Sequence, residues 1–117
     1  MNKKGKRSML IATRLLLMGY NKVNRDSNHA EIVNELIQHN ISVLDLASLG
    51  GGCPDILIGF KTTKGSKFNL LVELKSSSKA KVRPIQEEFI RDWQGMSTIC
   101  WDAKSILHIC KYHGLKI

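Results

Sequence analysis

The sequence predicts an α/β domain in which a mixed sheet of about four strands is flanked by helices, in the order helix, strand, strand, strand, helix, strand, helix. Two segments, 26–40 and 84–93, place apolar residues at the three- and four-residue spacing of an amphipathic helix. Four short apolar runs, bounded by turn residues, have the length of strands. A short turn joins the second and third runs, whereas a helix joins the third and fourth, so antiparallel and parallel pairs are both expected.

The first helix is expected over residues 26–40, with Asp26 or Ser27 as its N-cap and Asn40 at its end. Its apolar stripe consists of Ala30, Ile32, Val33, Leu36 and Ile37. The segment 41–50, ISVLDLASLG, follows as the first strand. Its inward side chains are expected to be Ile41 and Val43, with Leu44 and Leu46 as further candidates.

The next two strands form a predicted hairpin. Residues 54–60, PDILIGF, are a short apolar run, and residues 68–75, FNLLVELK, are another. The intervening KTTKGSK contains Gly65 and is short enough to reverse the chain. The two strands are therefore expected to be antiparallel.

The C-terminal part of the chain is predicted to form a helix, a strand and a final helix. Pro84 suits the first turn of a helix, and Gly95 suits its end. Residues 97–101 form the fourth strand, parallel to the third, and Asp102 is expected to cap the last helix, AKSILHICKYH. The first of these helices places Ile85, Phe89 and Trp93 on one face, and Phe89 and Trp93 are expected in the core rather than stacked on bases.

The 117 residues fit one domain, assigned to residues 26–117, preceded by a basic N-terminal arm or helix over residues 1–25. This arm holds seven basic residues and no acidic residue. The formal net charge of the whole chain is +8, so nearly all of the excess positive charge lies in the arm. The remainder is nearly neutral, with eleven basic and ten acidic residues. A basic arm suggests contact with phosphates, and a solubilising tail explains the charge equally well.

The cysteines and the hydropathy of the chain indicate the cellular compartment in which it is expected. The chain has three cysteines, an odd number, and no C-x-x-C pair. This pattern favours a reducing compartment, and hence the cytoplasm, over a disulfide framework. No run of 18 or more apolar residues occurs, so no membrane span and no membrane partner are expected.

Two carboxylates and a lysine are predicted to meet at one end of the hairpin. In VELKS, Glu73 and Lys75 lie two residues apart and therefore share a face of the strand. Asp55 begins the preceding strand, and the start of one antiparallel strand lies beside the end of its partner. The plain alternative is an exposed ion pair between Glu73 and Lys75. Asp55 adds a second carboxylate at the same place, and the approach of two carboxylates costs energy unless a cation fills the site.

The donor atoms of this cluster indicate a hard cation. Carboxylate oxygens without neighbouring histidine or cysteine ligands favour Mg²⁺ or Mn²⁺ over zinc. Two carboxylates, a divalent metal and a lysine are typical of phosphodiester hydrolysis, in which the metal polarises the phosphate and activates a water. The lysine stabilises developing negative charge or helps to position the water.

With these residues in view, the chain resembles the VRR-NUC family of the PD-(D/E)-x-K, or restriction-endonuclease-like, superfamily. The resemblance covers about residues 26–112 and implies a restriction-endonuclease-like fold. It rests on Asn28 and Glu31–Val33, GGGCPD at 50–55, VELK at 72–75, and QEEFIRDWQG at 86–95.

The resemblance implies roles for individual residues. Asp55 and Glu73 would bind the metal, the backbone carbonyl of Leu74 would join them, and Lys75 would be the catalytic lysine. Glu31 would be a further acidic ligand, direct or through water, and Gln86 an accessory polar residue lining the site. Each of the last two has an ordinary alternative: Glu31 as a solvated acid in the first helical turn, with Glu35 as a competing candidate, and Gln86 as an exposed residue near a helix start.

Contacts with DNA are expected next to this site. The basic residues Lys79, Lys81 and Arg83 are candidates for contact with the phosphate backbone, although a solvated loop has the same composition. Gly51 and Gly52 are expected to form a tight turn that leaves room for a phosphate backbone to approach. No segment resembles a base-reading helix, so recognition of DNA shape is expected.

Together these features predict a magnesium- or manganese-dependent endodeoxyribonuclease of a bacterium or a phage-infected host cell. The resemblance implies branched DNA, such as a four-way (Holliday) junction, as the substrate and a homodimer as the working form. Two alternatives stay open. One is a non-catalytic DNA-binding or assembly protein that keeps the nuclease fold, and the other is a restriction-type endonuclease.

Overall fold

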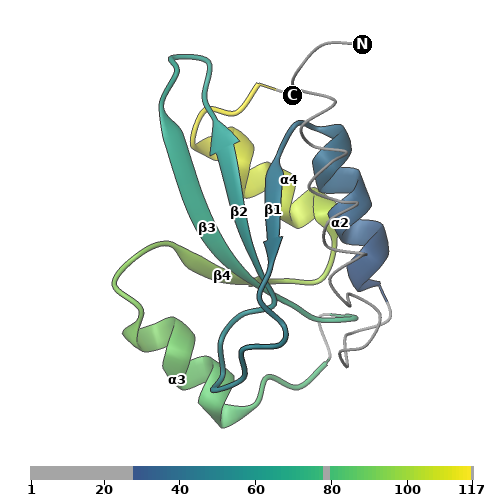
Figure 1. Ribbon diagram of the computed structural model, residues 1–117, viewed down its shortest axis with the longest axis vertical. Coiled ribbons are helices and arrows are strands. Elements are labelled where there is room, and N and C mark those ends of the chain that lie inside the picture. The colour runs from purple at the N-terminus through teal and green to yellow at the C-terminus, as the bar shows by residue number, and fades with distance from the viewer. Residues whose placement is uncertain (1–27, 78–79, 117) are drawn as a thin grey trace.

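The computed structural model describes residues 28–77 and 80–116 (Figure 1). The predicted basic arm, residues 1–25, and Lys79 lie outside the described residues. Within the described part, the chain forms three helices and a four-stranded mixed sheet, which confirms the predicted α/β class and element order. The elements are α2 (His29–Gln38), β1 (Ser42–Asp45), β2 (Ile56–Lys61), β3 (Lys67–Leu74), α3 (Pro84–Asp92), β4 (Ser97–Cys100) and α4 (Ala103–Tyr112).

The sheet has the order β1-β2-β3-β4. The pairs β1/β2 and β2/β3 are antiparallel, and β3/β4 is parallel, as the connections predicted. The first strand is shorter than the predicted segment 41–50. A carboxylate oxygen of Asp45 accepts a hydrogen bond from the backbone N–H of Ala47 at 2.8 Å, and this local turn ends β1.

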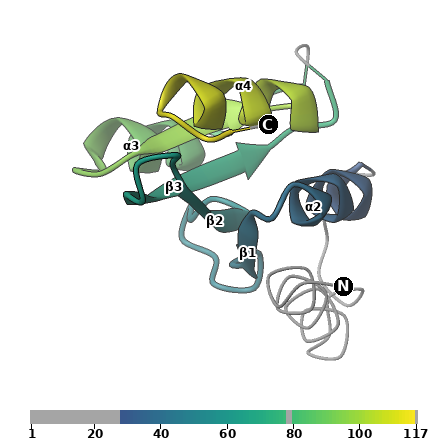
Figure 2. The ribbon, with the colours of Figure 1, turned by 90° about the horizontal axis from the view of Figure 1, so that it is seen from above.

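The hydrophobic core lies between one face of the sheet and the helices α2 and α4 (Figures 1 and 2). Side chains alternate along each strand, so Ile56, Ile58 and Phe60 of β2 face the same layer as Leu70, Val72 and Leu74 of β3. Helix α2 contributes the predicted stripe except Ala30, which is exposed, and α4 contributes an apolar stripe of its own. Their core residues are Ile32, Val33, Leu36 and Ile37 of α2, and Ala103, Ile106, Leu107 and Cys110 of α4.

Helix α3 lies apart from this core, below the sheet in Figure 1. The prediction that Phe89 and Trp93 enter the core was wrong: no residue of α3 belongs to the described core cluster. Ile85 is 47% exposed and Trp93 is 49% exposed. Phe89 is half-buried and stacks on Trp93, with ring centroids 5.5 Å apart. Helical spacing identified the stripe correctly but carried no information about whether the chain itself covers it.

The helix boundaries follow local chemistry, with two corrections. Asn28, rather than Asp26 or Ser27, occupies the N-cap position of α2, and it makes no side-chain capping bond. α3 begins at Pro84 as predicted but ends at Asp92, before Gly95. Asp102 caps α4 as predicted, because its side chain accepts a hydrogen bond from the N–H of Ser105 at 2.7 Å. No helix in the described residues is long and apolar enough to cross a membrane.

Candidate functional site

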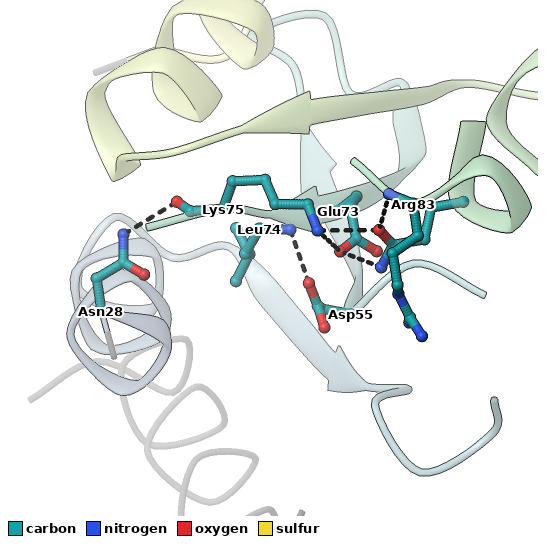
Figure 3. A network of polar contacts seen from close by, with 7 residues as sticks. Asn28, Asp55, Glu73, Leu74, Lys75 and Arg83 are labelled. Atoms are coloured by element: carbon teal, nitrogen blue, oxygen red, sulfur yellow. Dashed lines mark hydrogen bonds and ion pairs between the residues drawn. The ribbon is translucent and has the colours of Figure 1, made fainter. Parts of the chain in front are cut away.

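The hairpin register brings Asp55 and Glu73 to the same place. Ile56 pairs with Val72, so Asp55 before the one and Glu73 after the other lie opposite each other. The side chain of Asp55 reaches across the strand end, where its Oδ2 accepts a hydrogen bond from the backbone N–H of Leu74 at 2.8 Å (Figure 3). The meeting of the two carboxylates was predicted by counting outward from the turn, and the register confirms it.

Glu73 and Lys75 form a close and buried pair. Lys75 Nζ lies 3.4 Å from Glu73 Oε2 (Figure 3). Glu73 is only 2% exposed and Lys75 is 9% exposed, so the alternative of an exposed surface ion pair is excluded. Because side chains alternate along β3, Glu73 points to the face opposite the buried Val72 and Leu74, away from α2 and α4.

Gln86 links this pair to α3. Its carbonyl oxygen accepts hydrogen bonds from Lys75 Nζ at 2.9 Å and from the backbone N–H of Arg83 at 3.0 Å. Its amide nitrogen donates to Glu73 Oε2 at 2.9 Å. Gln86 is 6% exposed and is the buried residue of α3. The alternative of an exposed polar residue is therefore wrong, and Gln86 belongs to the cluster.

The electrostatics of the cluster favour a bound cation. Burial raises the pKa of Glu73 to about 8, and the neighbouring carboxylate of Asp55 raises it further, while Lys75 acts in the opposite direction. Glu73 Oε1 is buried and has no hydrogen-bond partner among the described residues. A carboxylate that is buried, repelled and left with a free oxygen is stabilised by a cation on that oxygen.

The donor set fits a magnesium-type ion. Asp55 and Glu73 offer oxygen donors, and Mg²⁺ commonly takes one or two carboxylates from a protein and keeps several waters. No group of three or more His, Cys, Asp or Glu side chains that could hold a metal gathers within the described residues. The side-chain donors at this place are therefore the two carboxylates, and the remaining positions would fall to backbone oxygens and water.

Glu31 does not lie with Asp55 and Glu73. It is exposed on α2, and so is Glu35, the competing candidate. Both line an open hollow on the outer surface of α2 with Asn34, Gln38 and His39. The residue that α2 brings to the cluster is Asn28, whose side-chain nitrogen donates to the backbone oxygen of Lys75 at 3.3 Å (Figure 3). Asn28 is among the residues on which the family resemblance rests, but nothing in the surrounding sequence indicates this contact.

The glycine loop before Asp55 packs against the start of α3. Gly50, Gly51 and Gly52 all have positive φ, between 65° and 80°. A Cβ on Gly52 would stand 2.5 Å from the backbone oxygen of Ile85, whereas a Cβ on Gly51 would meet nothing within 4 Å. Gly52, which was predicted to leave room for a phosphate backbone, is instead buried and packs against Ile85 next to Gln86, whereas Gly51 is exposed.

The thiol of Cys53, directly before Pro54 and Asp55, is affected by the carboxylates of the cluster. Burial raises the pKa of this thiol, and the charges of Glu73 and Asp55 raise it further.

Among the basic candidates for DNA contact, Lys81 and Arg83 are exposed just before α3 and at its start. Arg83 also holds Gln86 through its backbone N–H, so its position relative to the cluster is fixed.

Comparison with protein-family models, with curated proteins and with solved structures found no match for this chain.

Proposed function

We propose that this protein is a divalent-metal-dependent DNA endonuclease that hydrolyses phosphodiester bonds. The observation that carries the proposal is the buried cluster of Asp55, Glu73, Lys75 and Gln86, in which Glu73 Oε1 has no hydrogen-bond partner among the residues that the structure describes. Such a cluster lowers the stability of the folded protein, because a buried carboxylate beside another carboxylate is unfavourable. Its presence therefore favours a functional role. The antiparallel hairpin and the parallel fourth strand are in keeping with a restriction-endonuclease-like fold, and we propose membership of the VRR-NUC family.

In this proposal Asp55, Glu73 and the backbone carbonyl of Leu74 hold Mg²⁺ or Mn²⁺. The ion, when bound, polarises the scissile phosphate and lowers the pKa of a water. Asp55 is held in place by the N–H of Leu74, and Glu73 by Gln86, so both carboxylates are oriented before the ion arrives. Glu31 is left out of this ligand set, because it does not gather with the other two acids in the described structure.

Lys75 is proposed to stabilise the negative charge that develops on the phosphate. Its ammonium group has three hydrogens, of which Gln86 accepts one and Glu73 can accept another. The third is available for a phosphate oxygen or for the attacking water. Burial strengthens this interaction, since an ammonium group acts over a longer range where water is excluded. Gln86 therefore serves to orient Lys75 relative to Glu73.

The substrate is proposed to be branched or otherwise structured DNA, contacted through its phosphates by Lys81 and Arg83 and recognised by shape. A homodimer acting in the cytoplasm of a bacterium or of a phage-infected cell agrees with this role. A small domain presents one such cluster, and two copies would address two strands. Light scattering with and without junction DNA measures the stoichiometry directly.

The decisive experiment is cleavage of labelled duplex, nicked, flap and four-way-junction DNA in Mg²⁺, Mn²⁺ or EDTA. The proposal predicts metal-dependent cutting with preference for the branched substrates. Asp55→Ala and Lys75→Ala are expected to abolish cutting while leaving DNA binding in EDTA intact. Binding without cutting by the wild type under all conditions would instead support a non-catalytic DNA-binding protein.

A further inference from the structure

Asn28 connects three parts of the molecule that are distant in sequence. Its Nδ2 donates one hydrogen bond to the backbone oxygen of Lys75, at 3.3 Å, and another to the backbone oxygen of Trp101, at 2.9 Å. The first lies at the end of β3 and the second between β4 and α4. Figure 3 shows the Asn28 amide directed at the Lys75 carbonyl from the start of α2.

This contact completes the anchoring of the Lys75 backbone. The N–H of Lys75 donates to the carbonyl oxygen of Cys100 at 2.9 Å, which is the last link between β3 and β4. Its carbonyl group accepts from Asn28. The backbone N–H and the backbone carbonyl of Lys75 are thus both held, at the point where β3 ends and the irregular segment before α3 begins. Without Asn28, the neighbouring peptide would be free to rotate and the lysine side chain would follow it.

The hydrogen-bonding pattern of Asn28 indicates that its donor group is the part in use. It stands at the N-cap position of α2, yet its side chain makes no capping bond. Its Oδ1 is buried and has no hydrogen-bond partner within residues 28–77 and 80–116, which is unfavourable. A residue selected to cap the helix would use this oxygen to accept from the first turn. Here the amide hydrogens are used and the oxygen is left over.

We propose that Asn28 is a positioning residue that holds Lys75 in its working orientation. The inference rests on the proposed function in so far as Lys75 acts on a phosphate. In this proposal Asn28, rather than Glu31, is the residue that α2 contributes to the site. Asn28 acts through the Lys75 peptide and through the turn at Trp101, and it touches neither substrate nor metal.

The substitution Asn28→Asp separates this role from helix capping. Asp is as good an N-cap as Asn, and its charge is favourable at a helix N-terminus, so a capping role predicts no loss. A positioning role predicts a large loss, because a carboxylate would face two carbonyl oxygens and could donate to neither. Asn28→Ala, which removes the donor without adding charge, is the second variant. Asn34→Asp, an exposed position on the same helix, is the matched control.

The first measurement is amide hydrogen exchange of Lys75 in the full-length protein, without metal or DNA. Both Asn28 variants are expected to exchange at least tenfold faster at this amide, while amides in the centre of β2 are unchanged. Unaltered exchange at Lys75 in both variants would overturn the proposal. This measurement does not depend on activity, so it tests the contact even if the wild type proves not to cut DNA.

The second measurement is single-turnover cleavage at saturating DNA, together with DNA affinity in EDTA. Asn28→Ala is expected to lower the cleavage rate constant by about tenfold or more, with an unchanged Kd. Val33→Ala, which destabilises α2 from inside the core, is the control for a purely structural effect and should retain the rate. An equal loss in Val33→Ala and Asn28→Ala at the same residual stability would refute the positioning role.

Discussion

The substitution Glu73→Gln is expected to stabilise the metal-free protein at high pH and to leave it unchanged at low pH. Burial and Asp55 raise the pKa of Glu73 from 4.5 to about 8 in the folded state. Between these values the folded protein holds a proton that the unfolded chain has released, so stability falls as the pH rises through this window. Below it the carboxyl group is neutral in both states, and Glu73 contributes no pH dependence.

The size of the effect follows from the same two values. At about 1.4 kcal/mol per pKa unit, they correspond to at most about 5 kcal/mol between pH 4.5 and pH 8. Relaxation and entry of water reduce this bound, and a difference of about 2 kcal/mol is sufficient for measurement. Gln has the shape of the protonated acid, can still accept from Gln86 on one side and can donate toward Asp55 on the other.

The assay is urea unfolding of wild type and Glu73→Gln at pH 4 and pH 9 in EDTA, with Glu31→Gln as the exposed control. The variant should equal the wild type at pH 4 and exceed it by about 2 kcal/mol or more at pH 9. Adding Mg²⁺ at pH 9 should stabilise the wild type alone, by about 2.7 kcal/mol at a hundredfold excess over Kd. An equal loss of stability in Glu73→Gln at both pH values would show that the carboxyl group is not strained in the folded state.

Three further outcomes follow from the same geometry. Gly52→Ala should lower the free energy of urea unfolding by at least about 1 kcal/mol more than Gly51→Ala, since both residues have positive φ but the Cβ at Gly52 would meet Ile85; equal losses would contradict the packing role. Gln86→Leu should reduce single-turnover cleavage at unchanged DNA affinity, and should lower stability by about 1–3 kcal/mol, because the buried Lys75 and Glu73 lose a partner. Lys81→Gln and Arg83→Gln should each reduce the slope of log K against log salt by about 1 in fluorescence anisotropy; an unchanged slope would remove them from the interface.

The fold and the central pair of carboxylates could be predicted from the sequence because they depend on local rules. Alternation in FNLLVELK fixed the shared face of Glu73 and Lys75, and a turn at Gly65 fixed the register that brings Asp55 opposite. Both inferences require only the periodicity of a strand and the length of a turn. Helical periodicity likewise predicted the core stripe of α2 except Ala30, which is exposed.

The residues that sequence reasoning misplaced depend on how whole elements meet. Glu31 and Asn28 lie three residues apart on one helix, and only the position of α2 decides which of them reaches the end of β3. Its start, rather than its first turn, meets the strand end, so an amide donor contacts the Lys75 carbonyl and the acid stays in solvent. Trp93 was expected in the core for a similar reason, because periodicity does not indicate that α3 lies beyond the sheet.

The position of α3 gives the polar cluster a structural consequence. α3 adds nothing to the described core, and it meets the rest of the chain through Gln86, through the backbone of Ile85 against Gly52, and through the carbonyl of Ile90, which accepts from Ser97. The cluster that would hold the metal is therefore also one of the attachments of α3. A cation that relieves the repulsion between Asp55 and Glu73 would strengthen the attachment of α3, together with Arg83 at its start. Metal binding and the placement of Arg83, which we propose to contact DNA, would then depend on the same hydrogen bonds.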